Sequence, residues 1–136
     1  MTKQITFTLV VIATCILTSC KSTININQYV DKALPFGLTI TTTDSATGLT
    51  KLTHMNIEVN SVKYVKLINW FDKNQDGWRT TPASYVTNIG VTQGAFRLLY
   101  TSNSVGAIIG FTDKENKARQ YSKTIKRGEL DFLTDK

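Results

Sequence analysis

Apolar residues occupy every second position of residues 36–40 and again of residues 55–59. Because successive side chains of a strand point to opposite faces, this alternation predicts two half-buried β-strands. The polar segment of residues 44–48 between them ends in a glycine and is typical of a turn. The sequence therefore predicts an N-terminal β-hairpin.

The period of an α-helix follows in residues 61–71. Apolar side chains recur there on one helical face, and polar ones form a stripe on the other. Asn60 is expected to cap the start of this helix, and Asn74 or Gly77 to supply the left-handed residue that ends it. The polar stripe consists of Lys63, Lys66, Asn69 and Lys73.

Four further strands are expected after the helix, separated by short turns. Their segments are residues 86–92, 95–101, 105–112 and 118–125. Short turns favour an antiparallel meander, and the third strand, apolar on both faces, should lie at its centre. Residues 127–133 could add a last helical turn that packs on the sheet.

These elements predict an α+β fold. It consists of an N-terminal β-hairpin, one long helix and a four-strand antiparallel meander, with the helix packed across the sheet. The order of elements is similar to that of cystatin-like folds, in layout alone, because no cystatin inhibitory motif is present.

The first twenty residues have the plan of an export signal: a basic start at Lys3, an apolar run of residues 5–17, and small residues after it. The apolar run is too short to span a bilayer. The stretch Leu17-Thr18-Ser19-Cys20 resembles the lipobox of bacterial lipoproteins, in which cleavage precedes a cysteine that becomes lipidated. A short membrane anchor or an ordinary signal peptide are the alternatives.

The resemblance implies three segments. Residues 1–19 would be a lipoprotein signal peptide, and residues 20–35 the lipidated Cys20 with a flexible tether, because their composition is polar and aperiodic. Residues 36–136 would form a single α+β domain. In enteric-type sorting an Asp after the lipidated cysteine retains the protein in the inner membrane. Lys21 stands there, which implies the outer membrane with the domain facing the periplasm; some bacterial groups display such proteins on the surface instead.

Charge and cysteine content limit the partners and the kinds of site that can be expected. The chain has a net charge of +6 but no run of basic residues interleaved with aromatics, so nucleic acid is not an expected partner. Anionic lipid heads, cell-wall polymer or an acidic protein fit better. Cys15 lies in the apolar run and Cys20 would carry lipid, so we expect no disulfide, no thiol nucleophile and no cysteine metal site.

Asp72, Asn74, Asp76 and Gly77 match the opening of a calcium-binding loop. The pattern then requires a glutamate where this chain has Ala83, and no second helix is expected. A calcium site would therefore be weak, and the alternative is a polar helix end. We expect no cofactor besides the covalent lipid on Cys20.

No set of catalytic residues is apparent. His54, the single histidine, falls on the polar side of its strand, and the chain has no G-x-S-x-G motif and no obvious carboxylate pair. We expect that this chain is not an enzyme.

Trp78, Arg79 and Tyr85 are expected to contact a protein partner, because aromatic side chains and arginine anchor interfaces. The alternative is that Trp78 folds back into the core. The resulting hypothesis is a lipid-anchored, non-catalytic envelope protein that binds and neutralises a toxin or hydrolase, as immunity- or inhibitor-type lipoproteins do. Alternatives are a structural or assembly accessory lipoprotein of the outer membrane and a weak calcium-binding module.

Overall fold

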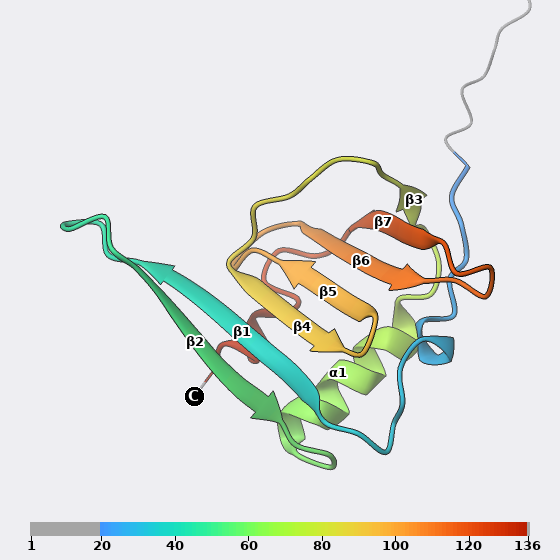
Figure 1. Cartoon of the computed structure of the whole chain (residues 1–136), viewed down its shortest axis with the longest axis horizontal. Helices are drawn as coiled ribbons and strands as arrows, with labels where there is room; N and C mark the ends of the chain where they lie inside the picture. Colours follow the sequence, from blue (N-terminus) through green and yellow to red (C-terminus); the bar gives the residue numbers. More distant parts are fainter. Residues whose placement is uncertain (1–19, 136) are drawn as a thin grey trace, which may run out of the picture.

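One antiparallel sheet with a helix on one of its faces makes up the fold (Figure 1). The structure, a computed structural model, describes residues 20–135. The sheet has seven strands in the order β2-β1-β4-β5-β6-β7-β3. In chain order the elements are η1 Ile26–Gln28, β1 Phe36–Thr43, β2 Thr50–Ile57, α1 Val62–Lys73, β3 Arg79–Thr80, β4 Ile89–Gln93, β5 Phe96–Tyr100, β6 Gly106–Thr112, β7 Ala118–Thr124 and η2 Asp131–Leu133.

This architecture corrects the predicted fold. An N-terminal hairpin, one long helix and a four-strand meander were expected; instead the strands of residues 20–135 join one seven-stranded antiparallel sheet, with the hairpin paired to β4 and the 12-residue α1 on one face. β1 pairs with β4 as well as with β2, and the two-residue strand β3 adds to β7 at the far edge. The alternation of apolar residues shows which side of each strand is buried, but it does not show which strands become neighbours.

A row of apolar side chains crosses the sheet and explains why β1 joins β4. Leu38 lies opposite Val91, Val91 opposite Leu98, Leu98 opposite Ile109, and Ile109 opposite Tyr121. Directly opposed side chains on one face of a sheet are close enough to pack. The first four are buried, so this face is the core side of the sheet.

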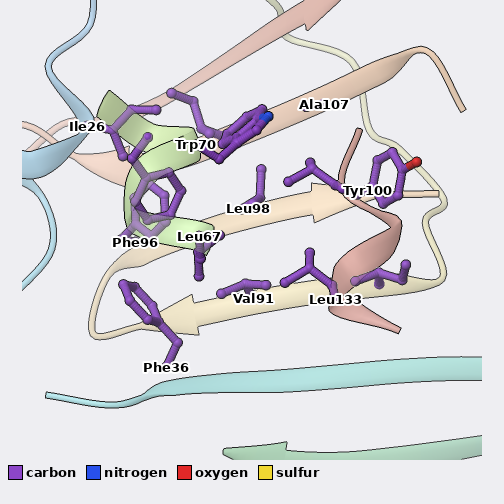
Figure 2. Close-up of a cluster of buried hydrophobic side chains, with 14 of the residues drawn as sticks. Ile26, Phe36, Leu67, Trp70, Val91, Phe96, Leu98, Tyr100, Ala107 and Leu133 are labelled. Carbon is purple, nitrogen blue, oxygen red and sulfur yellow. The ribbon is translucent and has the colours of Figure 1, made fainter. Parts of the chain in front are cut away.

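Helix α1 covers that row with Tyr64, Leu67, Trp70 and Phe71. In Figure 2 Leu67 and Trp70 lie over Val91 and Leu98. The helix starts one residue later than expected: Ser61 is its N-cap, and the Ser61 side chain accepts a hydrogen bond from the Tyr64 N–H at 3.2 Å. Gly77, at φ +83°, turns the chain away from the helix end, as only a residue without a Cβ does readily.

The predicted tether is part of the folded domain from Ser22 onward. Ile24 and Ile26 are buried, and the Ile24 N–H donates to the Gln75 carbonyl at 2.7 Å. The Tyr29 ring stacks on Phe111 with 3.7 Å between centroids. Isolated isoleucines in a polar stretch have no period that would indicate this burial.

The loop after β3 is longer than expected, because β4 begins at Ile89 and residues 81–88 remain outside the sheet. The expected helical turn near the C-terminus is the short helix η2, which follows the buried Leu130 and contains the buried Leu133. Within residues 20–135 no helix is long and apolar enough to cross a membrane. The signal peptide predicted for residues 1–19 lies outside the described residues.

Candidate functional site

A groove of about 650 Å³ separates the loop of residues 81–88 from one end of β6 and β7. The loop forms the yellow-green arch at the top of Figure 1, on the side where the described chain begins. Lys21, at that beginning, and Arg79 of β3 also line the groove. The other lining residues are Gly77, Tyr85, Val86, Thr87, Thr101, Ser104, Val105, Gly106, Ala107, Ile108, Ser122, Lys123 and Thr124.

Hydrogen bonds to Gln120 of β7 hold one end of the loop. The Thr81 N–H donates to the Gln120 carbonyl at 3.1 Å, and the Gln120 side chain donates to the Ala83 carbonyl at 2.6 Å. Arg97, lying across the sheet, donates to the Gln120 side-chain oxygen at 2.9 Å. The loop is therefore tied to the sheet at Gln120.

Cations and hydroxyl groups line the groove together with apolar side chains. Lys21, Arg79 and Lys123 contribute positive charge, and no Asp or Glu is among the described residues that line it. Within residues 20–135 neither Lys21 nor Arg79 has an ion-pair partner. Such a surface attracts anionic groups.

Lys123 is the most enclosed of the three cations. Its Nζ lies 5.8 Å from the centroid of the Trp78 ring, within the range of a cation–π contact. Burial lowers the pKa of Lys123, while the nearby Glu129 and Asp76 act in the opposite direction. Lys21 and Arg79, both exposed, therefore carry the accessible charge of the groove.

Trp78 lies in the core beneath this groove. Its side chain is 0 % exposed, its Nε1 donates to the Asn74 carbonyl at 2.6 Å, and its ring packs edge-on against Trp70. The expectation that Trp78 contacts a partner is corrected, because its ring offers no accessible surface. The alternative interpretation, a tryptophan folded back over the helix end, is the one that the structure has.

Arg79 and Tyr85, the other two expected partner-binding residues, lie at the same groove. Arg79 is exposed on β3, opposite Ser122. Tyr85 is 40 % exposed, and its hydroxyl lies 2.7 Å from the Thr81 Oγ1. The structure thus brings Arg79 and Tyr85 together at one surface and separates them from Trp78.

Asp72, Asn74 and Asp76, the candidate calcium ligands, are engaged in three separate contacts. Asp72 accepts from the Asn27 side chain at 2.7 Å, and Asp76 accepts from the Thr23 hydroxyl at 2.6 Å. Asn74 is buried, and its amide donates to the Trp70 carbonyl and to Glu129. These residues tie the N-terminal segment and the C-terminal region to the helix end. In residues 20–135 no three His, Cys, Asp or Glu side chains gather as a metal site.

The single histidine, His54, is exposed on β2, and its Nδ1 lies 2.9 Å from the Thr39 Oγ1. Both residues line a shallow hollow of about 360 Å³ next to Gly37. No carboxylate lines that hollow among the described residues, and the Thr39 hydroxyl is the side-chain hydrogen-bond partner of the His54 ring.

A second exposed surface is the β1–β2 hairpin. In β2 every residue is exposed except Thr53 and Ile57, and the turn between the strands is exposed throughout. Leu49, Leu52 and Met55 expose 71 %, 55 % and 41 % of their surface. β2 is an edge strand that pairs only with β1 among the described residues.

Several residues of these surfaces were not expected from the sequence. Lys123 shares a strand face with Tyr121, and a lysine on the inward face of an alternating strand is a signal for a special environment. The sequence predicts a strand at Val86, and no local pattern indicates that it lies in a loop. The exposed hairpin could have been suspected, because residues 41–54 are mostly polar on both strand faces.

No family model, no curated protein sequence and no solved structure matches this chain.

Proposed function

We propose that this chain is a lipid-anchored, non-catalytic envelope protein that binds and neutralises another protein, as immunity- or inhibitor-type lipoproteins do. Its anchor would be lipid on Cys20, its location the outer membrane, and its domain would face the periplasm. The observation that carries the proposal is the exposed β1–β2 hairpin, in which residues 42–52 are all exposed.

The edge strand β2 suits recognition of a protein. An unpaired strand edge presents backbone N–H and C=O groups to which another chain can add a strand. Natural proteins usually protect such an edge with proline, a bulge or several charges. β2 has eight residues, one lysine and no proline, and it exposes Leu52 and Met55 on its two faces.

The position of the hairpin supports the same proposal. In Figure 1 the hairpin tip and the beginning of the described chain lie at opposite ends of the long axis. A protein held to a membrane at Cys20 would therefore extend β2 away from the bilayer, where a partner can reach it. We therefore propose the partner contact on β2 rather than at Arg79 and Tyr85.

The test is capture of a partner from an envelope extract by residues 20–136 carrying Cys20→Ser. We expect one stoichiometric protein, to be identified and then bound again in purified form. The double variant Leu52→Lys, Met55→Lys should lose this binding at least tenfold, since lysine on an edge opposes strand addition. Both residues are exposed, so the free energy of unfolding should change by no more than about 0.5 kcal/mol.

The matched control is Val62→Lys, Val65→Lys on α1, which makes the same chemical change at residues that are 74 % and 47 % exposed. This control should bind normally. Equal losses in both variants would contradict a contact at β2. Recovery of abundant membrane-assembly proteins in place of one toxin or hydrolase would favour the accessory role instead. Separately, Cys20→Ser in the full chain should abolish incorporation of labelled fatty acid into the protein.

A further inference from the structure

The residue proposed to carry lipid lies almost at the surface of the folded domain. The Ser22 N–H donates to the Trp78 carbonyl at 2.7 Å, and the Trp78 N–H donates to the Ser22 carbonyl at 3.2 Å. Two residues of extended chain span at most about 7 Å. The two headgroup layers of a bilayer together add roughly 10–15 Å to the hydrocarbon core. One layer is therefore about as thick as the length of these two residues. Lipid on Cys20 would thus hold the surface around Trp78 against the headgroups.

The charge of that surface fits anionic headgroups. Lys21 and Arg79 are exposed at the groove, and none of its described lining residues is acidic. Each Lys or Arg near an anionic membrane contributes attraction that decays over a Debye length. Two nearby carboxylates act on Lys123: Glu129, and Asp76, which accepts a hydrogen bond from Thr23.

The loop beside these cations presents apolar surface to solvent. Val86 is fully exposed, Tyr85 is 40 % exposed, and Val105, which also lines the groove, is 47 % exposed. The bond between Tyr85 and Thr81 holds the tyrosine in this position. Tyrosine is enriched where proteins meet the membrane–water interface, because its ring is apolar and its hydroxyl polar.

We propose that the rim of the groove docks on an anionic phospholipid surface. Lys21 and Arg79 contact the headgroups, and Tyr85 and Val86 enter the interfacial layer. This inference rests on the proposed lipidation of Cys20, which would bring the rim to the membrane. Arg79 and Tyr85 would then orient the domain on the membrane, and β2 would remain free to bind a protein partner.

The first test measures binding of residues 20–136 with Cys20→Ser to vesicles. The buried core residues of the described chain all lie within residues 24–133, so this fragment contains them. We expect binding to vesicles that contain phosphatidylglycerol, weakening with salt, and far weaker binding to pure phosphatidylcholine. Lys21→Glu, Arg79→Glu should weaken binding roughly tenfold or more, since two favourable charges become unfavourable.

The charge-matched control is Lys51→Glu, Lys114→Glu. These exposed lysines lie in β2 and in the turn between β6 and β7, outside the groove. The control changes the net charge equally and should lower binding less than threefold. The proposed docking surface is overturned if the two double variants weaken binding equally. It is also overturned if residues 20–136 with Cys20→Ser do not bind the anionic vesicles.

The second test locates the contact. After Cys20→Ser, residues 20–136 contain no cysteine, so Val86→Cys and Leu49→Cys can each carry one polarity-sensitive dye. Anionic vesicles should shift the emission at position 86 to the blue and leave position 49, at the hairpin tip, unchanged. An unchanged spectrum at position 86 would contradict insertion of the loop.

Failure of these tests is distinguishable from failure of the proposed function. The vesicle experiments contain neither covalent lipid nor a protein partner, and partner capture is tested with substitutions on β2. If Lys21→Glu, Arg79→Glu instead abolished capture of the purified partner and left vesicle binding unchanged, the groove would be a protein contact and the inference would be wrong.

Discussion

Trp78 and Tyr85 show how two aromatic residues of one segment acquire opposite environments. Trp78 follows Gly77 and forms a bridge to Ser22, which directs its ring under the helix end, where it is fully buried. Tyr85 lies after Pro82 in a loop that leaves the sheet, so its ring stays at the surface. From residue type alone, either Trp78 or Tyr85 could anchor a partner. The direction of the backbone decides which of the two rings is accessible to one.

At the residue scale, stability at high pH should depend on Tyr100. Its buried hydroxyl donates to the Asp131 Oδ1 at 2.7 Å, and burial together with this bond raises the pKa of Tyr100 to about 12. The unfolded chain loses this proton near pH 10 and the folded one near pH 12, so the folded state binds more protons between these values. The free energy of unfolding should therefore be unaffected below pH 10 and fall by roughly 2–3 kcal/mol between pH 10 and 12.

Urea unfolding at a series of alkaline pH values measures this loss, and absorbance titration gives the tyrosine pKa. The control Tyr100→Phe should lower stability at neutral pH by about 1 kcal/mol, through the lost hydrogen bond. Tyr100→Phe should also remove most of the fall in unfolding free energy between pH 10 and 12. The raised pKa of Tyr64, caused chiefly by burial, leaves a residual slope. An unchanged slope in Tyr100→Phe would show that the decline has another origin.

At the scale of single elements, the start of α1 tests how closely sequence signals locate a helix end. Asn60 was expected to be the cap, but it has φ +66°, and Ser61 caps the helix. Ser61→Ala should lower the free energy of unfolding by about 1 kcal/mol, since the Tyr64 N–H loses its acceptor. Asn60→Gly should be neutral or stabilising, because glycine adopts a positive φ without strain.

Chemical denaturation of both variants gives the comparison, with Ser61→Asp as the conservative control that keeps a capping oxygen. If Asn60→Gly lowers the free energy of unfolding more than Ser61→Ala does, Asn60 and not Ser61 is the capping residue. Both residues are common before helices, and the sequence does not distinguish them, because the choice depends on the angle at which the chain leaves β2.

Local patterns predict single strands well in this chain and their extents less well. The alternation in residues 36–40 corresponds to β1, and the apolar segment of residues 105–112 to β6, which is buried on both faces. The strand predicted for residues 86–92 begins three residues before β4 does. The β-branched residues Val86 and Thr87 fit a strand as readily as a loop. Pairing of β1 with β4 crosses some fifty residues of chain, and no local pattern encodes it.

At the scale of the whole molecule, residues 20–26 should contribute to stability. Ile24 and Ile26 are buried at 6 % and 0 % exposure, and removal of residues 20–26 takes both away. A chain of residues 27–136 should lose roughly 3–6 kcal/mol of unfolding free energy relative to residues 20–136, since each buried isoleucine contributes roughly 1.5–3 kcal/mol. Thermal unfolding measures the difference.

The control begins at Ser22, which keeps the bridge to Trp78 and both isoleucines, and should melt like residues 20–136. Equal stability of the chain of residues 27–136 would restore the view that this segment is a flexible tether. A chain of this size has a small core and a small net stability, so the loss of two buried isoleucines is measurable.

The sequence by itself determined the position of most strands, the helical face and the basic character of the chain, because these depend on the type and spacing of neighbouring residues. It also contains the lipobox-like stretch from which the anchor at Cys20 is proposed. The tertiary structure alone decided that β1 joins β4, that Trp78 is core, and that Lys21 meets Arg79 at one groove. These features arise from contacts between distant segments, which form where apolar surfaces must be covered and leave no local period in the chain.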